Sequence, residues 1–486
     1  MLGTTFLYSH PKYQLLNKDS GMSLSDVTNW AVNEFAEADL GDLRRTQGLV
    51  ELAHTLAQNP KASLPEACGS AAMLKGAYRF FENDDIAPDD IVQSHVEATY
   101  PRLDQVPLVL AVQDTTEIDW SSLKATEGLG PLGNSACRGL FVHSTLAITP
   151  DRVPLGLLAQ WVWARDPDDI GKSARRKHLP VTEKESQKWL HSLDAVLSAR
   201  DSCPGTHFVS VGDREADIDD VLAAERPAGV DWLIRASWDR CVSAPQRYVW
   251  ASIEVQPVAC EIVIQVPRRG PQPAREATLS LRYCPLTLSP PRHRKAEGLP
   301  QVTLWAVLVR EVDASDGVKP IEWVLWTTVE VKTVEDAIER VSWYSCRWGI
   351  EIWHRILKSG CRIEARQFET AERLKRCLSI YSVVAWRVLY ATMLARAVPE
   401  VPCSVLLEPD EWQALYCAIH RVPQPPVEPP SLGQAVKWIA QLGGFVGRRR
   451  SDRPGPEVLW RGFQHLSDLT SMYCIMRPDP LDTPPK

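Results

Sequence analysis

Residues 106–116 have the sequence VPLVLAVQDTT. The run 106–112 is apolar and rich in valine, which predicts a buried β-strand followed by Asp114. A second such strand, HFVSVG at 207–212, is followed by Asp213. Two carboxylates at the ends of neighbouring strands repel each other unless a cation lies between them, and Mg²⁺ prefers such oxygen ligands. Taken singly, an aspartate after a strand is also an ordinary turn or capping residue.

Between these two strands the sequence predicts a hairpin and a helix. The segments 143–149 and 153–164 flank a turn at Pro150-Asp151-Arg152, and residues 183–199 have a helical pattern. Strand, hairpin, helix and strand, with an aspartate after the first and the last strand, is the order of a ribonuclease-H-like core. We therefore predict an α/β protein.

The flanking sequence divides into further regions. We interpret 1–21 as an extension before a candidate start at Met22, and 22–100 as a helical domain. The predicted core spans 101–229 and 331–370, interrupted at 230–330 by proline-broken alternating runs that are typical of an inserted antiparallel β region. Residues 371–486 are predicted to be helical, with a proline-rich tail.

Composition excludes several classes of protein. The chain has 486 residues, of which 44% are hydrophobic and 24% charged, which excludes a mostly disordered chain. It contains no CxxC pair, HExxH, GxSxG or phosphate-loop motif, and no N-terminal secretion signal. We expect a cytoplasmic protein with no membrane partner. The net charge is −7, yet basic stretches at 268–297 and 347–387 accompany an acidic one at 82–119. Such a distribution suits a metal-dependent enzyme acting on a polyanion, and solvated charged faces produce it equally well.

A third acidic residue is indicated by helical spacing. We predict a continuous helix over about 334–359, in which Tyr344, Arg347, Glu351 and Lys358 share one stripe. Glu351 then has cationic and hydroxyl neighbours suited to a metal ligand beside phosphate. The opposite side is apolar and predicts a core-facing surface made of Ile350, Ile352, Trp353, Ile356 and Leu357. The alternative is a solvated helix face with ordinary salt bridges.

The pattern Tyr344-x2-Arg347-x3-Glu351-x6-Lys358 resembles the Tyr-Arg-Glu-Lys signature of DDE transposases in the insertion-sequence-four group. LAVQDTT (110–116) and VGDREADI (211–218) are similar to the first and second Asp motifs of that group. Further similar stretches follow in the same order, so that the resemblance runs from about residue 25 to about 470. They are LGDLRRT (40–46), KGAYRFFEN (75–83), EKESQKWL (183–190), WLIRAS (232–237), EWVLWT (322–327) and LGGF (442–445). The departures are residues 1–21, a proline-richer inserted region and the tail.

The resemblance implies a cut-and-paste transposase of bacterial origin, associated with the nucleoid. Its partners would be double-stranded DNA, both transposon terminal repeats and target DNA, and a second copy of the chain as a homodimer in the paired-end complex. Residues 22–100 would bind transposon ends and 371–486 would dimerise. Asp114, Asp213 and Glu351 would be the catalytic residues and would hold two Mg²⁺ ions per active site, with Mn²⁺ able to substitute.

The resemblance also assigns DNA contacts. Tyr344, Arg347, Lys358 and Arg235 match residues that hold phosphates of the transposon end, and Trp323 matches one that stacks on a flipped base. Its alternative is a core tryptophan in an apolar strand. Further end-binding positions are Arg44, Arg45 and Arg79, and His354 and Arg214 adjoin the three carboxylates as assisting residues.

Three other functions share some of these features. A ribonuclease-H-like nuclease that does not transpose needs the same carboxylates but no end-binding or dimerisation region. A DNA-binding regulator derived from a transposase needs the basic residues but not the three carboxylates. A glycosidase uses two carboxylates without metal, and the 18 tryptophans of the chain are able to line a sugar site.

Overall fold

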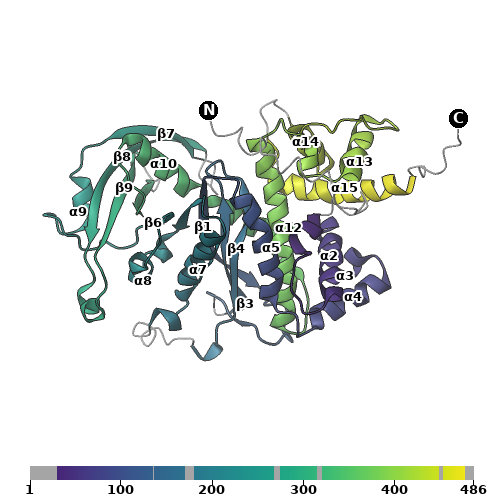
Figure 1. Ribbon diagram of the computed structural model, residues 1–486, viewed down its shortest axis with the longest axis horizontal. Coiled ribbons are helices and arrows are strands. Elements are labelled where there is room, and N and C mark those ends of the chain that lie inside the picture. The colour runs from purple at the N-terminus through teal and green to yellow at the C-terminus, as the bar shows by residue number, and fades with distance from the viewer. Residues whose placement is uncertain are drawn as a thin grey trace.

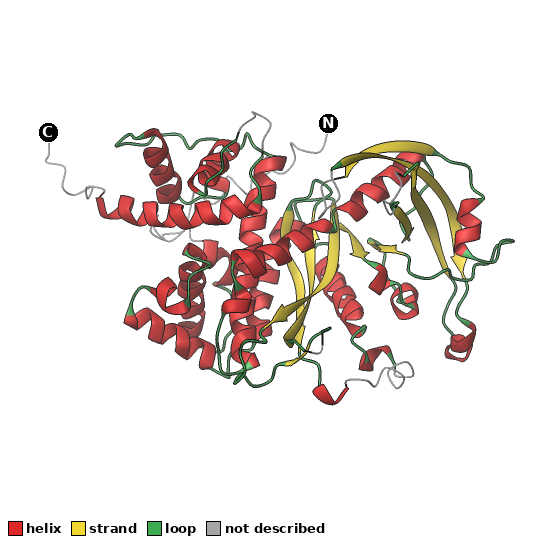
Figure 2. Ribbon diagram, turned by 180° about the vertical axis from the view of Figure 1, so that it is seen from behind, coloured by secondary structure: helices red, strands yellow, loops and turns green. Residues whose placement is uncertain are grey.

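The computed structural model describes residues 30–134, 136–169, 180–266, 274–314, 320–447 and 453–476. A sheet of ten strands has the order β2-β3-β1-β5-β6-β10-β9-β8-β7, with β4 also paired to β3. Helices cover both faces of this sheet (Figures 1 and 2). The strands are β1 (Leu108–Asp119), β2 (Gly130–Pro131), β3 (Arg138–Ile148), β4 (Pro154–Trp163), β5 (His207–Gly212), β6 (Val230–Arg235), β7 (Cys260–Val266), β8 (Arg275–Leu288), β9 (Val302–Val312) and β10 (Glu322–Thr327).

The half of the sheet that contains β1 has the predicted order. β1 pairs in parallel with β5, β5 pairs in parallel with β6, and β3 and β4 form the predicted hairpin. Helix α7 (Gln187–Ser202) packs on one face, where Leu193 and Val196 share a buried cluster with Val109 and Phe208. Because helices cover both faces, these strands carry nearly continuous apolar runs.

The region predicted as an insertion, 230–330, belongs to the same sheet. Its first strand, β6, pairs in parallel with β5 and is therefore part of the core. β10 pairs antiparallel with β6, and β9, β8 and β7 continue outward as antiparallel neighbours. The antiparallel part thus begins after β6, later than the predicted boundary at 230, because a strand's own pattern does not show which neighbour it pairs with. The described short helices of this region are α9 (Val249–Glu254) and η6 (Arg292–Glu297), and α8 (Asp219–Ala223) lies between β5 and β6.

The N-terminal region is helical, as predicted, and packs on the long helix α12 (Ala371–Ala397), while its last helix also packs directly on β4 (Figure 1). Two buried arginines fix this contact. Arg376 of α12 donates to the carbonyls of Phe81 and Ile86 at 2.9 and 2.7 Å, and Arg366 donates to those of Pro60 and Ala62. The N-terminal helices are α1 (Trp30–Phe35), α2 (Leu43–Gln58), α3 (Leu64–Cys68), α4 (Ala71–Glu82) and α5 (Pro88–Leu103).

Helix α12 is the one described helix that is long and apolar enough to cross a membrane, but 83% of that window is buried inside the protein. That is the setting of a central core helix.

The C-terminal helices are α13 (Pro409–His420), α14 (Leu432–Leu442) and α15 (Pro456–Met476), where the sequence predicts helices at 432–442 and 458–473. Leu415, Ile439 and Phe463 from these helices lie in the same buried cluster as Val109 and Phe208 of the sheet. The C-terminal helices therefore share a buried cluster with one face of the sheet. The predicted extension 1–21 and the end of the proline-rich tail lie outside the described residues.

Candidate active site

The strand register brings Asp114 and Asp213 to equivalent positions. The last parallel pair between β1 and β5 is Val112 with Val211, and each aspartate follows two residues later. Asp213 lies after β5, as predicted, and caps the turn Arg214–Ala216 by accepting from the Glu215 N–H at 2.8 Å. Asp114 instead lies inside β1, which continues to Asp119 by pairing with β3. Adjacent parallel strands are about 4.8 Å apart, so the two side chains are neighbours at this edge.

The predicted continuous helix over 334–359 is broken. α10 (Val334–Ser345) ends near Tyr344, α11 (Trp348–Arg355) carries Glu351, and Lys358 lies in the π-helical turn Ile356–Gly360. Between α10 and α11 the N–H groups of Cys346, Arg347, Gly349 and Ile350 bond to carbonyls three residues back instead of four. The tighter winding changes the direction of the side chains on either side of it. Most of the predicted core face is buried, namely Ile350, Trp353, Ile356 and Leu357. Its remaining member, Ile352, is half-buried.

Arg347 connects the first aspartate to the glutamate. Its Nη2 donates to Glu351 Oε1 at 2.5 Å, and its Nη1 lies 3.5 Å from Asp114 Oδ2. The Arg347 side chain is 12% exposed, so it is held in place by surrounding protein. The arginine between α10 and α11 thus joins a strand residue and a helix residue that are far apart in sequence.

The aspartates lie in an environment that disfavours their charge. Burial raises the pKa of Asp114 to about 6; the Arg347 guanidinium opposes this shift, and the neighbouring Asp213 and Glu351 carboxylates add to it. Burial also raises the pKa of Asp213, and Arg347 and Lys188 oppose that shift. Asp114 is therefore electrostatically coupled to both of the other carboxylates, and Arg347 offsets only part of their mutual repulsion.

The donor chemistry of these side chains fits a hard divalent cation, because all three offer carboxylate oxygen. Among the residues that the structure describes, however, no three His, Cys, Asp or Glu side chains are gathered closely enough to hold a metal ion together. Arg347 occupies the place between Asp114 and Glu351. A metal site at the three carboxylates therefore stays a prediction, and it requires the Arg347–Glu351 pair to open.

Arg235, Tyr344 and Trp323 lie side by side next to Arg347. Arg235 ends β6, and its Nη2 donates to the Glu322 carbonyl at 2.9 Å. Burial lowers the pKa of Arg235, while the adjacent Tyr344 raises it. The Trp323 ring meets Tyr344 edge-on, with centroids 5.5 Å apart, and is half-buried. Trp326 lies in a different buried cluster, on the opposite face of β10.

The remaining predicted residues of the core lie around this group. Lys358 pairs with Glu364 at 3.6 Å. His354 is buried, and burial lowers its pKa to about 3, helped by the charges of Lys358 and Arg347, so its ring is neutral. Arg214 is exposed on the turn after Asp213. The phosphate contact of Lys358 and the assisting roles of His354 and Arg214 stay predictions.

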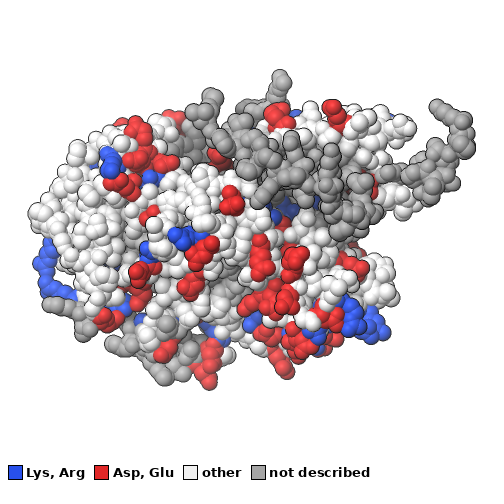
Figure 3. Space-filling view, viewed as in Figure 1, with Lys and Arg blue, Asp and Glu red and all other residues white. Residues whose placement is uncertain are grey.

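The predicted end-binding arginines lie on the N-terminal helices. Arg44 is 87% exposed and pairs with Asp42, the capping residue of α2, at 2.7 Å. Arg45 pairs with Asp85 at 2.5 Å, and Arg79 lies on the exposed face of α4. Figure 3 shows Lys and Arg side chains gathered near α4 at the lower right of the molecule, next to many acidic side chains. DNA binding by Arg44 and Arg45 would therefore exchange existing ion pairs for phosphates.

Trp348 is an aromatic residue next to Arg347 that the sequence motifs alone did not single out. It follows Arg347 directly, is 44% exposed, and its ring lies 6.0 Å from the Arg347 guanidinium. Its position between Arg347 and Glu351 in the sequence is the feature that could have predicted its place near the site.

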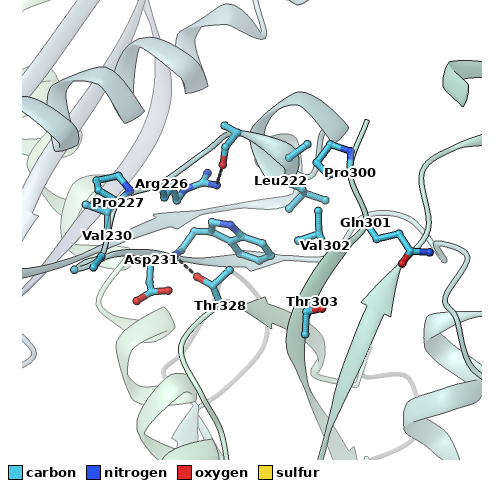
Figure 4. Close-up of a pocket in the computed structure, with 15 residues that line it drawn as sticks. Leu222, Arg226, Pro227, Val230, Asp231, Pro300, Gln301, Val302, Thr303 and Thr328 are labelled. Atoms are coloured by element: carbon cyan, nitrogen blue, oxygen red, sulfur yellow. Dashed lines mark hydrogen bonds between the residues drawn. The ribbon is translucent and has the colours of Figure 1, made fainter. Parts of the chain in front are cut away.

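A cavity of about 390 Å³ lies apart from the carboxylates, near the start of β6 (Figure 4). Arg226 on its wall donates to the carbonyls of Val221 and Ala224 at 2.7 and 2.8 Å. Thr328 Oγ1 accepts from the Trp232 N–H at 3.1 Å. This cavity lies at the opposite end of β6 from Arg235 and is not part of the candidate active site.

Two family models match the chain. One, described as Transposase DNA-binding, matches residues 27–86, which contain α1 to α4. The other, described as Transposase Tn5 dimerisation domain, matches residues 383–473, from within α12 to α15. These matches support a Tn5-like transposase that binds DNA and forms homodimers.

Proposed function

We propose that this chain, which carries transposase DNA-binding and dimerisation regions, is a cut-and-paste DNA transposase of the DDE type. Its reaction would be metal-dependent hydrolysis and transesterification of phosphodiesters at transposon ends: nicking, hairpin formation, hairpin opening and joining to target DNA. The two domain matches support a transposase but do not cover the catalytic residues. We assign the catalytic reaction to the carboxylates at the β1–β5 edge.

One observation carries the proposal: Asp114 and Asp213 occupy equivalent positions on adjacent parallel strands, and Arg347 links Asp114 to Glu351. We infer that these carboxylates hold Mg²⁺, or Mn²⁺ in its place, as two ions per active site. When bound, the ions would lower the pKa of an attacking water or 3′-hydroxyl and offset charge on the phosphate. Asp114, with its pKa raised to about 6, gives up any proton easily at neutral pH.

The cationic residues around the carboxylates would position the DNA. Arg347 is the central one, because a phosphate is a stronger bidentate partner than the single Glu351 oxygen it now contacts. When a phosphate takes the guanidinium, Glu351 is released toward the two aspartates. Tyr344, Arg235 and Lys358 surround Arg347 and would hold further phosphates, with His354 and Arg214 assisting. Trp323, beside Tyr344, would stack on a base flipped out of the hairpin.

The end-binding and pairing functions belong to the flanking regions. We assign recognition of terminal repeats to the 27–86 region, including Arg44, Arg45 and Arg79, and assembly of the two-end complex to the 383–473 region. A ribonuclease-H-like nuclease without transposition needs neither region. A regulator derived from a transposase keeps both, and only the intact carboxylates argue against it.

The test is cleavage of DNA that carries the terminal repeats flanking this chain's own coding sequence, with and without Mg²⁺. We expect metal-dependent nicked, hairpin and released products in sequence. Asp114→Ala, Asp213→Ala and Glu351→Ala should each abolish cleavage while leaving the gel shift of a single end intact. Full cleavage by any of these variants would contradict the catalytic assignment, and a gel shift without cleavage by the unaltered protein would favour the regulator.

A further inference from the structure

A buried chain of hydrogen bonds runs from helix α7 to the residue after Asp114. Thr145 Oγ1 donates to Ser192 Oγ at 2.7 Å, and Ser192 Oγ lies 3.1 Å from His143 Nε2. His143 Nδ1 lies 3.0 Å from Thr115 Oγ1. The Thr115 backbone N–H in turn donates to Asp114 Oδ1 at 2.9 Å. The chain therefore ends on a carboxylate oxygen of the candidate active site.

This chain and the active site lie on opposite faces of β1. Side chains alternate along a strand, so Asp114 points toward Arg347 while Thr115 points toward α7. His143 is 2% exposed and Ser192 1%, and the Trp189 ring of α7 meets the imidazole edge-on at 4.8 Å. Burial, with the charges of Lys188, His354 and His191, lowers the pKa of His143 well below its usual value, so the ring is neutral.

The local sheet structure explains why such an anchor is needed. The β1–β5 ladder stops at Val112, and beyond it β1 is paired only with β3. Asp114 is thus two residues past the point where its strand is held on both sides. A strand paired on one side moves more easily, and its carboxylate with it.

The hydrogen-bond donors favour one tautomer of the ring. The Ser192 oxygen accepts the Thr145 proton, so its own single proton is available for His143 Nε2. A neutral ring that accepts at Nε2 carries its proton at Nδ1 and donates it to Thr115 Oγ1. We infer that His143, as the Nδ1–H tautomer, is a positioning residue that holds Thr115 and thereby aims the carboxylate of Asp114.

As a consequence, the two carboxylate oxygens of Asp114 have different partners. Oδ1 is taken by the Thr115 N–H, and Oδ2 is the oxygen that faces Arg347. This leaves one defined oxygen for a cation. The inference rests on the proposed function, since it matters for catalysis only if Asp114 is a metal ligand.

The tautomer is measured first, on the unaltered protein without metal or DNA. Long-range ¹H–¹⁵N spectra of histidine-labelled protein, with His143 assigned by its loss in His143→Asn, should show a neutral ring protonated at Nδ1. A ring protonated at Nε2, or charged at pH 7, would overturn the inference whatever the enzyme does.

The positioning role is then tested with variants that differ in one atom or group. Thr115→Val keeps the backbone N–H but removes the hydroxyl, and His143→Gln places its amide at the Nε2 position only. Both should weaken Mn²⁺ binding, measured by calorimetry without DNA, about tenfold and slow single-turnover nicking to a similar degree. His143→Asn, whose amide N–H sits where Nδ1–H does, should recover both to within about threefold of the unaltered protein.

Ser210→Ala is the matched control, because Ser210 is a buried hydroxyl on β5 that has no hydrogen-bond partner among the described residues. It should change neither Mn²⁺ binding nor nicking. If Thr115→Val binds Mn²⁺ as tightly as the unaltered protein, or if His143→Asn and His143→Gln are equally impaired, the inference is wrong. Failure of the proposed function has a different signature: Asp114→Ala would then leave Mn²⁺ binding and cleavage unchanged.

Discussion

The guanidinium of Arg347 lies 3.5 Å from the carboxylate of Asp114, although one residue joins two helices and the other lies inside a central strand. Because the same guanidinium also holds Glu351, the protein without metal satisfies its buried carboxylates with an internal cation. In the proposed mechanism a DNA phosphate takes this guanidinium, so the free and the DNA-bound states would differ in what Arg347 contacts, and this difference is measurable.

Arg347→Ala should change metal binding and cleavage in opposite directions. Loss of the competing cation should tighten Mn²⁺ binding to the DNA-free protein by roughly three- to tenfold, since a nearby positive charge repels the ion. Cleavage should fall by at least about tenfold, because a phosphate ligand is lost. Arg347→Lys is the control: it keeps the charge, so Mn²⁺ affinity should stay close to normal while cleavage is still impaired. Weaker Mn²⁺ binding by Arg347→Ala would contradict the arrangement.

Trp323→Ala should slow hairpin formation roughly ten- to a hundredfold and spare the first nick, which needs no sharp bend. An indole that stacks on a flipped base contributes about 1–3 kcal/mol. Single-turnover reactions resolved into nicked, hairpin and released products measure this. Trp323→Phe keeps an aromatic face and should be impaired less. An equal loss at all steps would mean that Trp323 only supports Tyr344, which it contacts edge-on.

Glu408, at the start of α13, should make stability depend on pH. Burial raises its pKa to about 7, as do the Glu411 and Asp410 carboxylates, and Arg387 opposes the shift. A pKa raised by folding stabilises the protein at low pH, and this contribution is lost as the pH rises through 7. Glu408→Gln stays neutral, so it should match the unaltered protein at pH 4.5 and melt about 1–3 °C higher at pH 8. Glu428→Gln, at an exposed loop position, should show no such difference.

Two glycine substitutions should have opposite effects. A Cβ at Gly462 of α15 would lie 1.9 Å from the Ile439 carbonyl of α14, so Gly462→Ala must push these helices apart. We expect a loss of roughly 2–4 kcal/mol in the free energy of unfolding. A Cβ at Gly48 of α2 meets nothing within 4 Å, and Gly48→Ala should stabilise by about 0.5–1 kcal/mol. Chemical denaturation measures both, and similar values for the two would show that α14 and α15 do not pack this closely.

The exposed end of α15 should be needed for pairing of two DNA ends. Met472, Ile475 and Met476 are 54%, 77% and 74% exposed, an apolar surface of the kind that a partner subunit covers. Ile475→Lys with Met472→Glu should abolish the two-end complex in gel-shift assays and leave single-end binding intact. Point substitutions are used here instead of a truncation, because Ile439 and Phe463 are buried with residues of the sheet and their loss would destabilise the fold.

Local sequence patterns were enough to predict many of the helices and strands and to propose the residues of the candidate site. Apolar runs specify β1 and β5, a three-residue turn specifies the β3–β4 hairpin, and 432–442 was predicted to its ends, because each of these signals lies within a short window. The same windows identified Asp114 and Asp213, and the spacing of Tyr344, Arg347 and Glu351 pointed to their association. The two family models match residues 27–86 and 383–473, which lie inside the predicted regions 22–100 and 371–486.

The packing of these strands and helices against one another is seen only in the tertiary structure. That β6 joins the core sheet depends on which strand it pairs with, and pairing between distant segments leaves no trace in the pattern of either. The close approach of α11 to the sheet is also a tertiary feature: a Cβ at Gly349 would lie 2.6 Å from Ile148 Cδ1 at the end of β3. Local sequence fixes which groups are available, and long-range packing fixes the distances between them, because those distances are set by contacts between segments far apart in the chain.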